Sequence, residues 1–159
     1  MKALVISDTH GYAAILEKVL EKEQDIDILI HCGDVEGEEK YIRDLVHVPC
    51  YFVGGNMDAG SGLNKEITIK LDDCRCFITH GHWYGVSIAY DHLVDEAMSR
   101  KADIVLCGHT HKPVLKTFGR LTLMNPGSLA LPRQMGRKKT YGIIQFDREH
   151  EPHFFIREI

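Results

Sequence analysis

Five short apolar runs in this chain each end abruptly in a polar cluster, and this pattern constrains the fold more than any other feature of the sequence. The polar clusters are Asp8-Thr9-His10, Gly33-Asp34, Gly55-Asn56, Thr79-His80-Gly81 and Gly108-His109-Thr110-His111. Short, uninterrupted apolar runs are typical of strands that are buried on both faces of a sheet. Ligands of such sheets bind beyond the carboxyl ends of the strands, so we expect these polar side chains to converge at one edge.

The first part of the chain alternates between predicted strands and predicted helices. Strands are expected at residues 3–6, 26–30 and 51–53, and helices at residues 12–23 and 38–46. In residues 12–23 the apolar side chains recur with helical spacing, and charged side chains occupy the opposite face. This β-α-β-α-β order implies parallel strands that are joined by right-handed crossovers.

The pattern changes after residue 60. The sequence predicts a hairpin around Asp72-Asp73, a helix and a further series of strands. The hairpin strands are expected at 66–71 and 75–79, the helix at 88–101, and the later strands at 104–106, 114–118, 121–124, 141–146 and 153–157. Because no internal repeat or linker interrupts the chain, we expect one α/β domain over residues 1–159, with two packed mixed sheets and helices on their outer faces.

Composition and charge narrow the functional classes. At 159 residues, with 44% hydrophobic and 26% charged residues, the chain has the composition of a globular domain. Its formal net charge of −4 provides no general field for wrapping duplex nucleic acid, so any anion must be held at a local site. No apolar stretch is long enough to span a membrane, and the apolar run after Met1-Lys2 is too short for a signal peptide. We therefore expect a cytoplasmic protein.

The five cysteines do not form the pattern of a disulfide framework or a zinc ribbon, because their number is odd and no C-x-x-C pair occurs. Cys32 and Cys107 each end an apolar run next to a glycine, where small buried hydrophobic residues are common. We interpret the cysteines as reduced thiols in the core, and a redox or ligand role is the alternative.

The polar clusters together supply enough donors for two metal ions. Taken singly, each cluster is typical of a turn, a helix cap or a surface histidine, but their recurrence at successive strand ends indicates a site. The donors are Asp8, His10, Asp34, Asn56, His80, His109 and His111. These donors exceed the needs of one divalent ion, whereas two ions that share Asp34 as a bridge use all of them. The mixture of imidazole and oxygen donors favours Mn, Fe, Zn, Ni or Co over Ca or Mg.

The motifs also carry a family resemblance. In order, D-x-H, G-D, G-N-x-D, H-G-H and G-H-x-H resemble the motifs of the calcineurin-like metallophosphoesterases. The later segment from Asn125-Pro126-Gly127-Ser128 to Pro132-Arg133 resembles the small YfcE-like phosphodiesterases of bacteria and archaea. The resemblance implies a four-layer α-β-β-α sandwich that holds two divalent ions, with manganese as the first candidate. By motif position it assigns Asp8, His10, Asp34 and His111 to the first ion, and Asp34, Asn56, His80 and His109 to the second.

The expected activity is that of a dinuclear metal-dependent phosphohydrolase, in the first place a phosphodiesterase that acts on a small-molecule phosphoester. A hydroxide bridging the ions would attack phosphorus in line, and the expected catalytic residues are Asp34, Asn56 and His82. Two ions, two aspartates and this hydroxide leave the site at about +1, which attracts an anionic ester. The alternatives are phosphomonoesterase or nucleotidase activity at the same site, and a non-catalytic scaffold similar to the retromer subunit of this fold.

The chain departs from the wider family at Met57, where many members have a histidine that stabilises the transition state or protonates the leaving group. A thioether cannot donate a proton. His82 is a candidate proton donor, and the alternative for it is a supporting or surface role. For Asp58 we expect a contact to Asn56 or to a ligand histidine.

Two further features near the motifs each allow two interpretations. The basic run Arg133, Arg137, Lys138 and Lys139 is either a solvated loop or a rim that steers phosphate toward the site. Trp83 and Tyr84 either line the substrate pocket or pack in the core or at a contact between copies of the chain. A homo-oligomer is the only protein partner that the sequence suggests.

Overall fold

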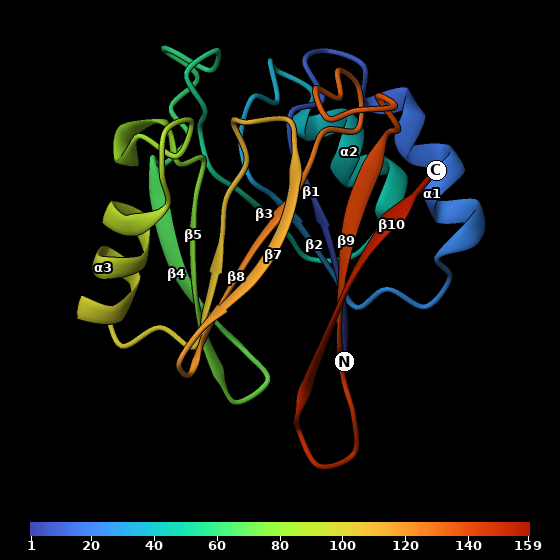
Figure 1. Cartoon of the computed structure of the whole chain (residues 1–159). Helices are drawn as coiled ribbons and strands as arrows, with labels where there is room; N and C mark the ends of the chain where they lie inside the picture. The colour runs from blue at the N-terminus through green and yellow to red at the C-terminus, as the bar shows by residue number, and fades with distance from the viewer.

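Two five-stranded sheets pack face to face, and helices cover their outer sides (Figure 1). The computed structural model describes residues 1–159. Helices α1 (Leu16–Lys22) and α2 (Glu39–Val46) lie on one side of the molecule and α3 (Asp91–Ser99) lies on the other, so the layers follow the order α-β-β-α. The expected fold class, with its two mixed sheets and outer helices, is confirmed.

The first sheet has the strand order β10-β9-β1-β2-β3. Its strands are β1 (Lys2–Ile6), β2 (Ile28–His31), β3 (Cys50–Phe52), β9 (Thr140–Phe146) and β10 (Pro152–Glu158). Strands β1, β2 and β3 are parallel, as the β-α-β-α-β order predicts. Strand β9 runs antiparallel to β1, and β10 runs antiparallel to β9.

The second sheet has the strand order β4-β5-β6-β8-β7. Its strands are β4 (Glu66–Leu71), β5 (Cys74–Thr79), β6 (Ile104–Leu106), β7 (Pro113–Phe118) and β8 (Leu121–Pro126). The three central strands are parallel, and the two edge strands run antiparallel to their neighbours. Both sheets therefore present the carboxyl ends of three parallel strands at the same end of the molecule (Figure 1).

The apolar runs are buried on both faces because every sheet lies between two layers. On β1, Ala3 and Val5 contribute to the core between the sheets, whereas Leu4 and Ile6 contribute to the core beneath α1 and α2. All five cysteines are free, and burial raises the pKa of the Cys32 thiol. The interpretation as buried core residues holds for four of the cysteines, whereas Cys74 is only partly buried.

The helices are shorter than the sequence predicts. The first begins as a 3-10 turn at Ala13–Ile15 and continues as α1 (Leu16–Lys22), α2 covers Glu39–Val46, and α3 covers Asp91–Ser99. The helix expected at residues 88–101 begins later because Gly85 has a left-handed conformation, with φ of 64°, at the end of the 3-10 turn His82–Tyr84. Ile88 is 95% exposed and belongs to no helix face.

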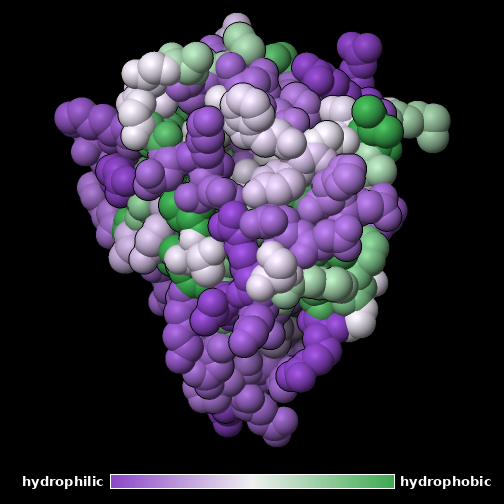
Figure 2. Space-filling model, turned by 90° about the vertical axis from the view of Figure 1, so that its left-hand side faces the viewer, coloured by the Kyte–Doolittle hydropathy of each residue, from purple (hydrophilic) through white to green (hydrophobic).

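On the face drawn in Figure 2, the two ends of the molecule differ in polarity. Figure 2 shows a tapered lower end that is almost entirely hydrophilic, whereas the exposed hydrophobic residues gather in the upper part. The upper end is where the parallel strands end (Figure 1). None of the helices combines the length and the apolar character needed to cross a bilayer.

Candidate metal centre

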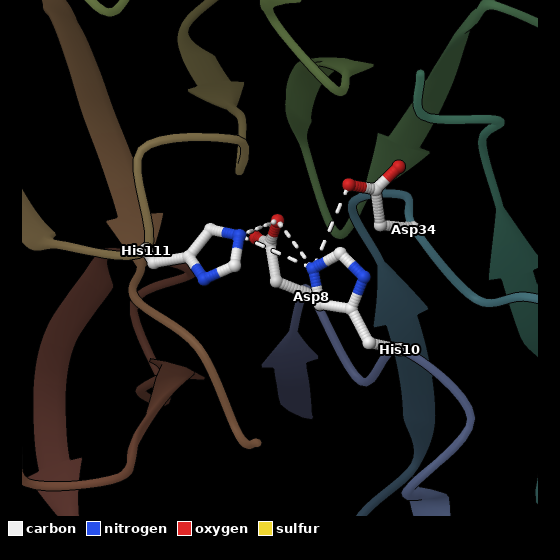
Figure 3. A group of neighbouring side chains, drawn as sticks. All are labelled: Asp8, His10, Asp34 and His111. Carbon is white, nitrogen blue, oxygen red and sulfur yellow. Dashed lines mark hydrogen bonds and ion pairs between the residues drawn. The ribbon is translucent and has the colours of Figure 1, made fainter. Parts of the chain in front are cut away.

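A first group of donors meets where β1, β2 and β6 end (Figure 3). His111 Nε2 lies 3.1 Å from Asp8 Oδ1 and 3.2 Å from His10 Nε2. His10 Nε2 lies 3.7 Å from Asp34 Oδ2. One nitrogen or oxygen of each of these four residues lies within 4.8 Å of the others, so the group could hold one cation.

A second group lies beside the first, on the loops after β3, β5 and β6. Asn56 Oδ1 is 3.1 Å from His80 Nε2 and 3.0 Å from His109 Nδ1. His80 Nε2 is also 3.3 Å from Asp34 Oδ2, the same oxygen that faces His10 in the first group. The structure thus brings all seven predicted donors together, with Asp34 between the two groups.

The outer ring nitrogens of three histidines contact hydrogen-bond acceptors. His10 Nδ1 is 2.7 Å from Glu36 Oε1, His80 Nδ1 is 2.7 Å from the Cys32 carbonyl oxygen, and His111 Nδ1 is 2.6 Å from the Leu131 carbonyl oxygen. Because carbonyl and carboxylate oxygens only accept, each Nδ1 carries a proton and donates it. In the neutral imidazoles, the Nε2 lone pairs therefore point into the site, as metal ligation requires.

In this arrangement acceptors face acceptors. Asp8 Oδ1 is buried and accepts no hydrogen bond, although the Nε2 lone pair of His111 lies 3.1 Å away. Such close pairs are stable only when a cation or a proton lies between them. At His80, burial opposes the charged form of the ring, but the hydrogen bond to Asp34 and the charge of Asp8 raise its pKa, so the site favours positive charge at this position. The donor set therefore fits two cations.

Both aspartates at the site are ionised at neutral pH. Burial opposes ionisation of Asp34, but the His80 side chain and the Met57 N–H lower its pKa to about 2. Burial likewise opposes ionisation of Asp8, whose pKa is nevertheless lowered by His111 and His80. Two carboxylates with low pKa values compete weakly for protons and suit cation binding.

The backbone at the site is held in unusual conformations. Five of the predicted donors have left-handed φ values between 48° and 69°; they are Asp8, His10, Asp34, His109 and His111. Non-glycine residues adopt this region at an energetic cost, and such residues concentrate at functional sites.

Two glycines allow the loops to approach one another. A Cβ on Gly55 would lie 2.1 Å from Asp34 Oδ1, and a Cβ on Gly108 would lie 1.9 Å from Ser7 Oγ. Any side chain at Gly55 would therefore displace the carboxylate shared by the two donor groups.

Asp58 has a different role from the one we predicted. Its buried carboxylate accepts hydrogen bonds from the backbone N–H groups of Val35, Glu36 and Gly55, and it contacts neither Asn56 nor a histidine. The prediction was wrong because the Asp58 carboxylate is already hydrogen-bonded to the backbone of the loop after β2, which carries Asp34. Asp58 therefore fixes the loop of Asp34 to the loop after β3.

His82 lies at the edge of the second donor group. Its ring centroid is 5.3 Å from that of His80 and 6.0 Å from that of His109, and its Nδ1 is buried without a partner. Burial, followed by the charges of His80 and His109, lowers the pKa of His82 to about 4. At pH 7 the ring is neutral, which makes it a weak proton donor. Met57, at the position where many family members have a histidine, is 56% exposed.

The two aromatic residues after His82 differ in their surroundings. Tyr84 packs edge-on against Phe77, at 6.2 Å between ring centroids, and its hydroxyl donates to Glu66. Trp83 is 66% exposed, and Lys65 Nζ lies 4.6 Å from the centroid of its ring. Tyr84 therefore contributes to packing, and only Trp83 is free to meet a ligand.

Five supporting residues have roles that the motifs did not predict. Glu36 accepts from His10, and Ser128 Oγ donates to the Asp8 carbonyl oxygen at 2.8 Å. Asn125 Nδ2 donates to the Gly108 carbonyl oxygen at 2.7 Å. Thr9 Oγ1 contacts the buried His31 Nε2 at 3.0 Å. The sequence signal that could have identified such residues is a polar side chain inside or next to an apolar strand, as at His31 and Asn125.

We predict that His31 makes the metal-free chain sensitive to acid. Its Nδ1 accepts the Gly33 N–H, and complete burial lowers its pKa from 6.5 to about 4 despite the opposing charges of Asp8 and Asp58. The unfolded chain therefore binds this proton more readily, so stability is full above pH 6.5 and falls as the pH is lowered toward 4. The loss reaches about 3 kcal/mol.

The measurement compares urea unfolding of the wild type and His31→Gln between pH 7 and pH 4. Glutamine can still accept from Gly33 and donate to Thr9, but it does not titrate. We expect the variant to lose less unfolding free energy over this range, and parallel curves for the two proteins would contradict the prediction.

Comparison with known proteins gives the same family as the motifs. Residues 1–149 match the calcineurin-like phosphoesterase superfamily domain. The chain is 30% identical over 150 residues to the protein from Bacillus subtilis that is named probable metallophosphoesterase YsnB, covering 94% of this chain and 86% of that protein. It is 28% identical over 172 residues to phosphodiesterase YfcE from Escherichia coli, covering 92% of this chain and 89% of that protein.

Solved structures agree with these sequence relationships. A predicted phosphoesterase from Streptococcus pneumoniae superposes with a TM-score of 0.81 at 28% identity, covering 98% of this chain and 97% of that one. A single-site variant of Vps29 from Entamoeba histolytica superposes with a TM-score of 0.78 at 23% identity, covering 100% and 99% of the two chains, which indicates a shared fold alone. The family match, the sequence relatives and the site together show that the chain belongs to the calcineurin-like phosphoesterase superfamily.

Proposed function

We propose that the chain is a phosphodiesterase with a dinuclear metal centre. The position of Asp34 Oδ2, 3.7 Å from His10 Nε2 and 3.3 Å from His80 Nε2, is the observation that carries this proposal, because one carboxylate then serves both donor groups. Proteins similar in sequence and named phosphodiesterase, such as YfcE, support the choice of a diester substrate.

The two groups divide the ligands between two divalent cations. Asp8, His10, Asp34 and His111 hold the first cation, and Asp34, Asn56, His80 and His109 hold the second. Manganese is our first choice for both, because imidazole donors favour transition ions over Mg²⁺, and Fe, Ni, Zn or Co would fit the same ligands. When bound, such ions supply a nucleophile derived from water and neutralise charge that develops on phosphorus.

The protein's own groups prepare the site for an anionic ester. The Met57 N–H holds Asp34 Oδ1 at 2.9 Å and leaves Oδ2 free to face both groups. Asn56 contributes a neutral oxygen, so only Asp8 and Asp34 offset the charge of the cations. The site keeps a net positive charge, which attracts a phosphoester although the whole chain carries −4.

Hydrolysis of matched aryl esters tests the proposed function. The metal-loaded protein should hydrolyse bis(p-nitrophenyl) phosphate faster than p-nitrophenyl phosphate, measured by release of nitrophenolate. A faster monoester reaction would replace the proposal by a phosphomonoesterase. No hydrolysis of either ester by protein shown to contain two ions per chain would favour the scaffold.

We predict that the rate of diester hydrolysis depends steeply on the leaving group. Met57 cannot donate a proton and His82 is neutral at pH 7, so the departing oxygen receives no proton from either side chain. Met57→His should raise the rate for the poorest leaving groups by up to about 10²-fold, at the lower end of general acid catalysis. The measurement is kcat/KM for a series of alkyl and aryl diesters.

Met57→Gln provides the matched control, because it has a similar length but no titratable group. Elemental analysis of each variant checks that the new imidazole has not altered the metal content. His82→Ala should leave alkyl diester hydrolysis unchanged. A large loss in His82→Ala, restricted to poor leaving groups, would instead make His82 the proton donor.

A further inference from the structure

We propose that a basic pocket beside His111 binds a second phosphoryl group of the substrate, so that the natural substrates are phosphodiesters that carry an additional phosphate. This inference rests on the proposed function and names the class of ester that the site takes. The pocket is a cavity of about 560 Å³ on the loop between β8 and β9. Its lining residues are Ala130, Leu131, Pro132, Arg133, Arg137 and Lys139.

The backbone of this pocket is joined directly to the first donor group. The Leu131 carbonyl oxygen accepts from His111 Nδ1 at 2.6 Å, and the Arg133 N–H donates to the His111 carbonyl oxygen at 3.0 Å. Arg133 also lines a neighbouring cavity together with Thr110, which lies between His109 and His111. The loop lies at the upper end of the molecule, where the strands of the site end (Figure 1). The pocket therefore adjoins the first donor group.

The positive charges of the pocket are not neutralised by acidic side chains of the protein. Three cationic side chains line it and no acidic one does, although acidic residues outnumber basic residues in the chain by 23 to 19. Arg133, Arg137 and Lys139 form no ion pair, whereas Lys138, within the same run, is paired with Glu158 at 2.6 Å. Unpaired cations that surround one cavity favour an anion with several acceptor oxygens, and arginine matches phosphate in particular.

The apolar residues that line the pocket favour a second phosphoryl group that is attached to an organic part of the substrate. Leu131, whose carbonyl oxygen accepts from His111, is 48% exposed and lines the pocket together with Pro132. These apolar surfaces can contact the carbon atoms that separate two phosphoryl groups. The scissile phosphate would lie at the two metal ions. The second phosphate would lie in the basic pocket beside His111.

Binding of two related nucleotides tests the pocket without requiring turnover. Thymidine 3′,5′-bisphosphate and thymidine 3′-phosphate differ by one phosphoryl group, and their affinities for the metal-loaded protein can be measured by titration calorimetry. We expect the bisphosphate to bind about tenfold more tightly, as a charge-assisted contact implies. In the double variant Arg137→Gln, Lys139→Gln the two affinities should become nearly equal. Arg133 is kept because it also lines the neighbouring cavity with Thr110, so its loss could act on the first donor group as well as on the pocket.

Lys138→Gln is the matched control, because it removes one charge from the same loop but outside the pocket. The advantage of the bisphosphate should persist in this variant, and in the wild type it should decrease as salt is added. Thermal unfolding checks that each variant is folded. Equal affinities in the wild type, an advantage that survives in the double variant, or an equal loss in Lys138→Gln would each overturn the proposal.

The outcome is separable from that of the proposed function. Bis(p-nitrophenyl) phosphate carries no second phosphoryl group, so its hydrolysis tests the centre alone. If the diester is hydrolysed but the two nucleotides bind equally, the proposed role of the pocket is wrong and the proposed phosphodiesterase activity stands. If the bisphosphate binds more tightly through Arg137 and Lys139 but the diester is not hydrolysed, the role of the pocket stands and the proposed activity is wrong.

Discussion

Removal of metal ions with a chelator should abolish diester hydrolysis, and Mn²⁺ should restore it more fully than Mg²⁺. All four histidines of the predicted ligand set direct a ring nitrogen to the two groups, and His80 and His111 do so from buried positions. Imidazole is a poor ligand for Mg²⁺ and a good one for transition ions. The measurement is the rate of nitrophenolate release by chelated, dialysed protein before and after each metal is added.

Two independent readouts accompany the rates. Elemental analysis should find two ions per chain after reconstitution, and the melting temperature should rise with free Mn²⁺, because the ions bind the folded chain preferentially. The rise has a structural reason, since bound cations would relieve the contact between Asp8 Oδ1 and the His111 lone pair. Full activity in protein that elemental analysis shows to be free of metal would contradict the proposed centre.

The fold was predictable because its apolar runs report burial directly. A run such as Ala3 to Ile6 can be apolar throughout only if both faces of its strand are covered, which requires a layer on each side of the sheet. Helix ends were less predictable. The helix expected from residue 88 begins at Asp91, because the left-handed Gly85 and the exposed Ile88 belong to a turn whose conformation depends on the loop around it.

The donors of the site were predictable for a related reason, whereas their supporting contacts were not. Strand ends bring Asp8, Asp34 and His80 together whatever the loops do in detail. The partners of these residues depend on side-chain direction, which spacing does not reveal. Asp58 illustrates this limit: its carboxylate binds the backbone of the Asp34 loop, although its position in G-N-x-D suggested a contact to Asn56 or a histidine.

Asp34→Asn should reduce diester hydrolysis on the order of 10³-fold, comparable with the loss of a principal electrostatic stabiliser. Asparagine keeps an oxygen for the Met57 N–H and tolerates the left-handed φ of 55°, so the metal-free chain should fold normally. Asparagine lacks the negative charge that the Asp34 carboxylate presents to both donor groups. We expect it to bind fewer ions than His111→Asn, which affects one group only.

Asp44→Asn is the matched control, because Asp44 is an exposed carboxylate on the outer helix α2 that pairs with Lys40 and with none of the donors. It should retain two ions and the wild-type rate. Unfolding of metal-free Asp34→Asn separates a lost bridge from a damaged fold. If folded Asp34→Asn still bound two ions and turned over normally, the carboxylate would not be shared, and the proximity of Oδ2 to His10 and His80 would reflect packing of the loops alone.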